Sequence, residues 1–135
     1  MMDTRKALAA VLAVCALGAA APAQTLPANA LVIFGSRYCA PCVAELKELP
    51  KISQWRGARP MVVAWIDKEP PPAIPGLPST RTVEWREARR MLVASTKGPS
   101  LAVPLVVATN GQGEVCGATR KPLSAAGVKA LTKGC

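Results

Sequence analysis

Two cysteines separated by two residues, Cys39 and Cys42, are the side chains of this sequence best suited to chemistry. Cysteine thiolates exchange with disulfides, and they also bind soft metal ions such as Cu(I). The chain contains no histidine, which excludes Ser-His-Asp and Cys-His nucleophile systems and every metal site built on imidazole. The pair therefore indicates either disulfide exchange or thiolate metal binding, and its structural setting has to separate the two.

The segments around the pair predict a strand that leads directly into a helix. Residues 30–35 form a continuous apolar run, which is typical of a strand buried on both faces. From Cys39 onward the apolar residues recur at three-residue steps, as in an amphipathic helix, and Pro41 suits its first turn. Unpaired N–H groups at the helix start favour a thiolate at Cys39, while Cys42, one turn inside, suits a more buried resolving role.

The rest of the chain predicts an α/β fold with a mixed central sheet of about four strands flanked by helices. Further strands are expected at residues 61–66, 105–109 and 114–117, the last two joined by an Asn110-Gly111 hairpin turn. Helices are expected at residues 81–95 and 123–133, with Ser124 near the start of the second. The proline-rich residues 69–79 predict an extended surface loop, either a simple connector or part of a docking face.

The first residues have the order of a secretory signal peptide. Arg5 and Lys6 precede an apolar run at residues 7–20, and small residues follow at 21–23. We expect a cleaved signal at residues 1–23, a single domain at residues 24–135 and a periplasmic location. An uncleaved anchor that leaves the domain facing the periplasm, or lipidation of Cys15, are the alternatives.

Removal of the signal leaves four cysteines, of which Cys116 and Cys135 are outside the Cys-x-x-Cys pair. A strand followed by an antiparallel helix can bring these two together, so they are a structural disulfide candidate. A loop of this size would contribute about 3 kcal/mol to stability. The alternatives are a free Cys116 with a reactive terminal Cys135, or a second redox pair.

The formal net charge of +9 limits the partners of the chain. Aromatic residues are few and no Lys/Arg run exceeds two residues, which argues against nucleic acid. Basic charge on an exported domain favours peripheral contact with an anionic membrane surface or with acidic proteins. A solvated basic surface without a specific partner explains the charge equally well.

These features together resemble the thioredoxin superfamily. The resemblance covers nearly all of the mature chain: the strand before the motif, the Cys39-to-Cys42 motif and the strand–strand–helix ending. Val103 and Pro104, just before the third strand, match the place of a cis-proline loop that faces the two cysteines. The resemblance implies that Pro104 is cis and that Val103, Pro104 and Pro41 contact an extended substrate segment.

The closer similarity is to the exported TlpA-like branch of this superfamily, because Glu45 stands three residues after the second cysteine. The resemblance implies that this carboxylate assists proton transfer at Cys42; the alternative is an exposed first-turn residue favoured by the helix dipole. The chain also departs from thioredoxin. Ile33 replaces a buried aspartate, Tyr38 replaces the tryptophan before the first cysteine, and Lys47 stands where a proline usually kinks the helix.

The resulting expectation is an exported protein thiol–disulfide oxidoreductase with Cys39, Cys42 and Glu45 as catalytic candidates, and with no cofactor and no metal. Its substrates would be cysteine-containing proteins, and the resemblance implies a membrane-embedded thiol donor. Ala40 and Pro41 supply no positive charge, which favours a reductase over a strong oxidase, unless Arg37 points at Cys39. A thiolate-based copper-handling module of the same fold and a non-catalytic interaction domain are the alternatives.

Overall fold

The computed structural model describes residues 26–55, 59–73, 81–98 and 100–135. Along the chain the elements are β1 (Leu31–Gly35), α1 (Ala40–Trp55), β2 (Met61–Trp65), β3 (Arg81–Thr82), α2 (Trp85–Thr96), β4 (Leu105–Thr109), β5 (Val115–Thr119) and α3 (Ala125–Thr132). The expected signal residues 1–23, Cys15 and most of the proline-rich loop, from residue 74 to its end, lie outside the described residues. In the part of the chain that is described, no helix is long and apolar enough to cross a membrane.

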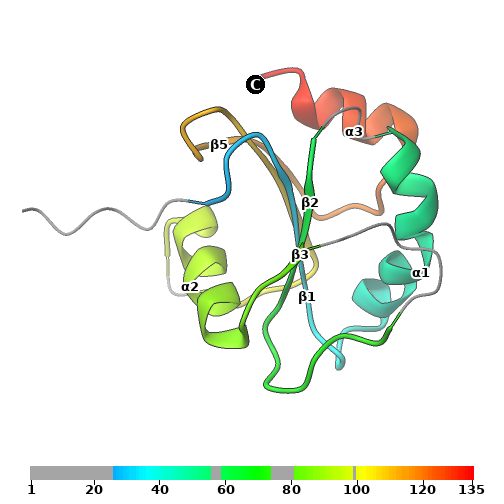
Figure 1. Ribbon diagram of the computed structural model, residues 1–135, viewed down its shortest axis with the longest axis vertical. Coiled ribbons are helices and arrows are strands. Elements are labelled where there is room, and N and C mark those ends of the chain that lie inside the picture. The colour runs from blue at the N-terminus through cyan, green and yellow to red at the C-terminus, as the bar shows by residue number, and fades with distance from the viewer. Residues whose placement is uncertain (1–25, 56–58, 74–80, 99) are drawn as a thin grey trace, which may run out of the picture.

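The strands form one mixed sheet in the order β3-β2-β1-β4-β5. β1 pairs in parallel with β2 and antiparallel with β4; β2 pairs in parallel with β3, and β4 pairs antiparallel with β5. Figure 1 shows α1 and α3 on one side of this sheet and α2 on the other. The predicted α/β class, a mixed sheet flanked by helices, is confirmed, and the arrangement is compatible with a thioredoxin-like fold.

The sheet has five strands in place of the predicted four, and the additional strand is β3. Its residues were expected to open a helix over residues 81–95, but they add to the edge of β2, with Arg81 opposite Val62. The helix begins only after Glu84, whose carboxylate accepts hydrogen bonds from the N–H groups of Arg86 (2.9 Å) and Glu87 (3.4 Å). Apolar periodicity could not reveal this start, because a carboxylate cap fixes it.

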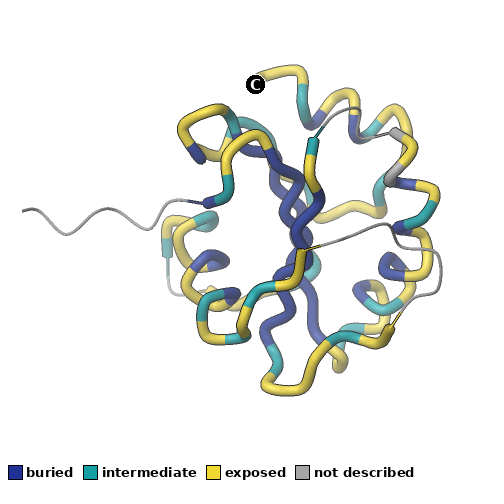
Figure 2. Tube along the Cα trace, viewed as in Figure 1, coloured by how far each residue is buried: buried dark blue, intermediate teal, exposed yellow. Residues whose placement is uncertain are grey.

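Every residue of β1, β2 and β4 is buried, since helices cover both faces of the central sheet. Figure 2 shows the central strands in dark blue, the colour of buried residues. Alternate residues of each strand point to opposite faces, and this alternation divides the core into two clusters. One cluster packs strand residues against α1 and α3, and the other packs them against Ala88, Met91 and Leu92 of α2. The continuous apolar runs in the sequence therefore indicate central strands that expose neither face to solvent.

The strand register brings three chain segments to one edge of the sheet. Gly35, the last residue of β1, lies opposite Trp65, the last residue of β2. Phe34 lies opposite Leu105, the first residue of the antiparallel β4. The segments after β1, after β2 and before β4 therefore meet at the same edge, and Cys39 follows β1 there.

Candidate active site

Cys39 and Cys42 are joined by a disulfide, with their Cα atoms 5.2 Å apart. Cys39 immediately precedes α1: its carbonyl oxygen accepts the N–H of Val43 (3.1 Å), and its Sγ accepts the N–H of Cys42 (3.2 Å). The sulfur thus occupies the place of a capping side chain, where N–H groups and the helix dipole stabilise negative charge. Cys39 is partly exposed, whereas Cys42 is only 3% exposed, so an external partner reaches the first sulfur more readily.

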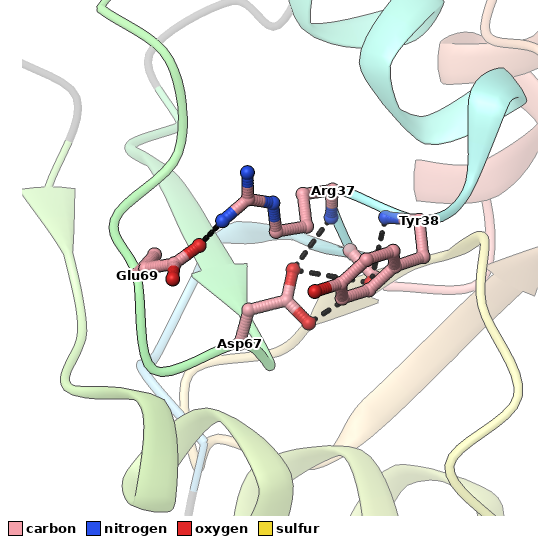
Figure 3. A network of polar contacts seen from close by, with 5 residues as sticks. Arg37, Tyr38, Asp67 and Glu69 are labelled. Atoms are coloured by element: carbon pink, nitrogen blue, oxygen red, sulfur yellow. Dashed lines mark hydrogen bonds and ion pairs between the residues drawn. The ribbon is translucent and has the colours of Figure 1, made fainter.

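The loop that carries Cys39 is held by Asp67, in the segment after β2 (Figure 3). The Asp67 carboxylate accepts hydrogen bonds from the Ser36 hydroxyl (3.0 and 3.1 Å) and from the backbone N–H of Arg37 (2.5 Å). Ser36 in turn accepts the N–H of Tyr38 at its Oγ (3.2 Å) and the N–H of Cys39 at its carbonyl oxygen (3.1 Å). The backbone just before the first cysteine is therefore fixed by a side chain from another strand end.

Arg37 points toward Glu69, with which its guanidinium forms an ion pair (Figure 3). The guanidinium carbon also lies 5.5 Å from the centroid of the Tyr38 ring, and Tyr38 itself is 86% exposed. Because a carboxylate balances its charge, Arg37 adds little net positive potential at the sulfur of Cys39. Tyr38 therefore presents a large exposed ring on the residue that directly precedes Cys39.

Glu45 is a buried acid on α1, only 8% exposed. The alternative of an exposed first-turn residue is therefore wrong, because α3 and the segment before it cover this side of α1. Burial raises the pKa of the Glu45 carboxyl above its ordinary value, and a weaker opposing effect comes from the Leu123 N–H, which donates to Oε1 (3.3 Å). Since residues three apart share a helix face, this acid lies on the same face as Cys42.

Apolar groups surround Cys42 on the sheet side. Ile33 lies opposite Val63 in the register, and both are buried. The position where thioredoxin has an aspartate is therefore occupied here by an apolar side chain, Ile33, that is shielded from solvent. A Cβ at Gly35 would come within 3.0 Å of the Cys42 Cβ and would overlap the Trp65 ring. Cys42 therefore packs against the bare backbone of Gly35, within the core cluster that also holds Trp65. These apolar surroundings disfavour a negative charge on its sulfur.

The segment before β4 contains a cis peptide bond between Val103 and Pro104. Because Leu105 pairs with Phe34, this bond lies beside the end of β1. Arg120 donates from Nη1 to the carbonyl oxygens of Ala102 (2.9 Å) and Pro104 (3.0 Å). Pro41 is exposed in the first turn of α1, so the three substrate-contact candidates lie at the same edge of the sheet.

Asp67 and Arg120 were not identified from the sequence. The sequence predicted a strand at residues 61–66, but it assigned no role to Asp67, which follows that strand, or to Arg120. Their partners lie 30 and 31 residues away for Asp67, and 16 and 18 residues away for Arg120, and no local pattern reports such contacts. A polar residue directly after a buried strand, at the edge where the cysteines are expected, was the available signal for Asp67.

Cys116 and Cys135 form a second disulfide, with Cα atoms 5.1 Å apart, which links β5 to the residues after α3. Two disulfides in so small a domain are typical of proteins in an oxidising compartment. Within the described ranges, no three His, Cys, Asp or Glu side chains gather as metal ligands do.

No family model, no curated protein and no solved structure matches the chain. What the protein does therefore has to follow from its own fold and from the chemistry of its own residues.

Proposed function

We propose that the chain is an exported protein thiol–disulfide oxidoreductase, a specialised relative of the TlpA-like branch of the thioredoxin superfamily. One observation carries the proposal: a Cys-x-x-Cys disulfide lies at a helix N-terminus, with the Cys39 sulfur accepting a helix N–H and Cys42 buried behind it. This asymmetry suits an attacking and a resolving thiol, because the more exposed sulfur is also the one whose thiolate is stabilised.

The proposed reaction is two successive exchanges. The Cys39 thiolate attacks one sulfur of a substrate disulfide, that S–S bond breaks, and the other substrate sulfur leaves as a thiolate. Cys42 loses its proton and attacks the Cys39 sulfur, which breaks the mixed disulfide and releases the second substrate sulfur. Two electrons pass to the substrate, whose two thiolates take up one proton from Cys42 and one from solvent. A donor dithiol then reduces the Cys39–Cys42 disulfide.

Glu45 has the proposed role of accepting the Cys42 proton and passing it on. A buried thiol in apolar surroundings does not ionise easily, so the second exchange needs a base close by. Burial raises the pKa of Glu45, which makes its carboxylate a better proton acceptor than an exposed one. The Leu123 N–H keeps one carboxylate oxygen in place.

The proposed substrates are cysteine-containing proteins that lie along the backbone of Val103 and Pro104 and over Pro41. The proposed compartment is the periplasm, reached through a cleavable signal, with a membrane-anchored form as the alternative. The reductant is a dithiol of a membrane protein. Reduction is favoured over strong oxidation because no cation stands between the two cysteines and the Arg37 charge is paired with Glu69.

The test is turnover of a disulfide protein such as insulin with a dithiol donor, together with equilibration against glutathione. We expect turnover that Cys39→Ser abolishes and that the double variant Cys116→Ser/Cys135→Ser retains. The potential should lie nearer that of thioredoxin, about −270 mV, than that of a strong oxidant, about −120 mV. Turnover indistinguishable from that of Cys39→Ser would refute the enzyme; a potential at the oxidising end would refute the reductase direction.

Metal analysis separates this proposal from thiolate copper handling. Protein purified under reducing conditions should contain copper well below one ion per chain. Near-stoichiometric copper that disappears in Cys39→Ser would favour the copper-handling module instead.

A further inference from the structure

Arg120, in the connection between β5 and α3, holds the segment that precedes β4. Its Nη1 donates to the carbonyl oxygens of Ala102 and Pro104, at 2.9 and 3.0 Å. These carbonyls belong to the residues before and after Val103, so the Arg120 side chain holds the backbone on both sides of Val103. Arg120 is an exposed residue.

The segment held by Arg120 lies next to the disulfide. Pro104 precedes Leu105, which pairs with Phe34, and therefore lies beside Gly35 at the end of β1. A Cβ at Gly35 would come within 3.0 Å of the Cys42 Cβ. A substrate segment attached to Cys39 that runs along this edge therefore meets the backbone that Arg120 holds.

Most of the hydrogen-bonding capacity of Arg120 is unused. A guanidinium carries five N–H donors, and both recorded bonds come from Nη1. Nε and Nη2 make no hydrogen bond, and the group makes no ion pair, with any residue in the described part of the chain. Arg37, at the same edge, differs because Glu69 neutralises it.

We propose that Arg120 determines substrate specificity: it fixes the backbone around Val103 and uses its remaining donors to bind a substrate carboxylate near the reacting cysteine. The inference rests on the oxidoreductase function proposed above. A guanidinium binds a carboxylate with two parallel hydrogen bonds, and the net charge of +9 favours acidic partners over the whole surface. The preferred substrates are thus cysteine segments that carry Asp or Glu within a residue or two of the cysteine.

The test uses three synthetic disulfide peptides that differ only in the residue after the cysteine: Glu, Gln or Lys. Wild-type kcat/KM should fall in that order, with Glu above Gln by about tenfold, as expected for a hydrogen bond to a charged group. Arg120→Gln should remove the preference mainly through KM, and Arg120→Lys should retain part of it. Arg120→Glu should invert the order, so that the Lys peptide becomes the best substrate.

Arg90→Glu is the matched control, because Arg90 is an exposed arginine on α2, which covers the opposite face of the sheet. It makes the same change in net charge and should leave the order unchanged. If wild-type protein reduces all three peptides equally, or if Arg120→Glu slows all three by one factor, the specificity role is overturned while the oxidoreductase stands. If wild-type protein reduces none of them and no disulfide protein either, the proposed function itself fails.

Discussion

Glu45 is the residue whose burial most needs a chemical reason. A carboxylic acid gains nothing from apolar surroundings, and its one recorded hydrogen bond, from the Leu123 N–H at 3.3 Å, only partly compensates for the loss of water. The proposed reaction would supply that reason, because Glu45 lies on the Cys42 face of α1 and a buried thiol needs a proton acceptor within the protein.

Replacing Glu45 by Gln tests this role directly. Glu45→Gln keeps the shape and an acceptor for the Leu123 N–H but cannot take a proton, so we expect kcat to fall by about a hundredfold, with KM little changed. The pH–rate profile of Glu45→Gln should lose the rise in rate with pH that accompanies deprotonation of Glu45. Glu48→Gln, an exposed change on the same helix, is the control, and an equal loss in both variants would contradict the role.

The raised pKa of Glu45 also predicts how stability depends on pH. Because the folded state holds this proton more tightly than the unfolded state, the free energy of unfolding falls as pH rises from 4.5 through the folded pKa. Glu45→Gln should abolish this decline and be more stable than wild type near neutral pH. Urea unfolding across pH measures it, and parallel curves for the two proteins would contradict the burial effect.

At the residue scale, the sequence predicted what local pattern can encode. Cys39 and Cys42 could be placed at a helix start because an apolar run ends shortly before them and helical periodicity begins with them. Asp67 and Arg120 could not be placed, because each acts on a segment that only the sheet register brings near. The burial of Glu45 stayed undecided for the same reason: it depends on Leu123, 78 residues away.

At the scale of elements, apolar runs predicted the long strands and helical periodicity predicted the helices, but neither revealed the two-residue strand β3. Two residues cannot show alternation, and both residues of β3 are exposed, so Arg81 and Thr82 resembled the start of the helix that follows. The N-cap at Ser124 was within reach of sequence reasoning, because a side-chain oxygen before an apolar helix is a local signal.

The contact between β5 and α3 depends on Gly117. A Cβ there would overlap the carbonyl oxygen of Leu131 in α3, so Gly117→Ala must push the helix away from the strand. We expect a loss of about 1–3 kcal/mol in the free energy of unfolding, measured by urea denaturation. Gly98→Ala, where the added Cβ would lie 4.0 Å from the Thr96 carbonyl oxygen, should change stability by less than about 1 kcal/mol.

If Gly117→Ala and Gly98→Ala lose the same free energy of unfolding, the loss in Gly117→Ala does not come from close packing against Leu131.

The Cys116–Cys135 disulfide fastens the same two elements. It closes a loop with a sequence separation of 19, and Cys116→Ser/Cys135→Ser should lower the free energy of unfolding by about 3 kcal/mol. Turnover at a temperature where the variant is folded should be unchanged, because the bond lies away from the Cys39–Cys42 edge. Loss of turnover in fully folded variant protein would instead assign this bond a part in the reaction.

At the scale of the whole molecule, the formal charge of +9 predicts a salt effect on encounter with substrate. The value of kcat/KM for an acidic disulfide protein should fall several-fold as salt rises from about 0.02 M to about 0.5 M, because the screening length drops below about 10 Å in that range. An uncharged disulfide peptide should show little change. A parallel fall for both substrates would indicate an effect on the enzyme and not on steering.

The central claim, that Cys39 attacks and Cys42 resolves, is tested most directly by trapping the mixed disulfide in the native host. Cys42→Ser should hold substrate proteins covalently through Cys39, as adducts that a reducing agent releases, while Cys39→Ser expressed to the same level should hold none. Abundant adducts on Cys39→Ser, or none on Cys42→Ser, would contradict the account.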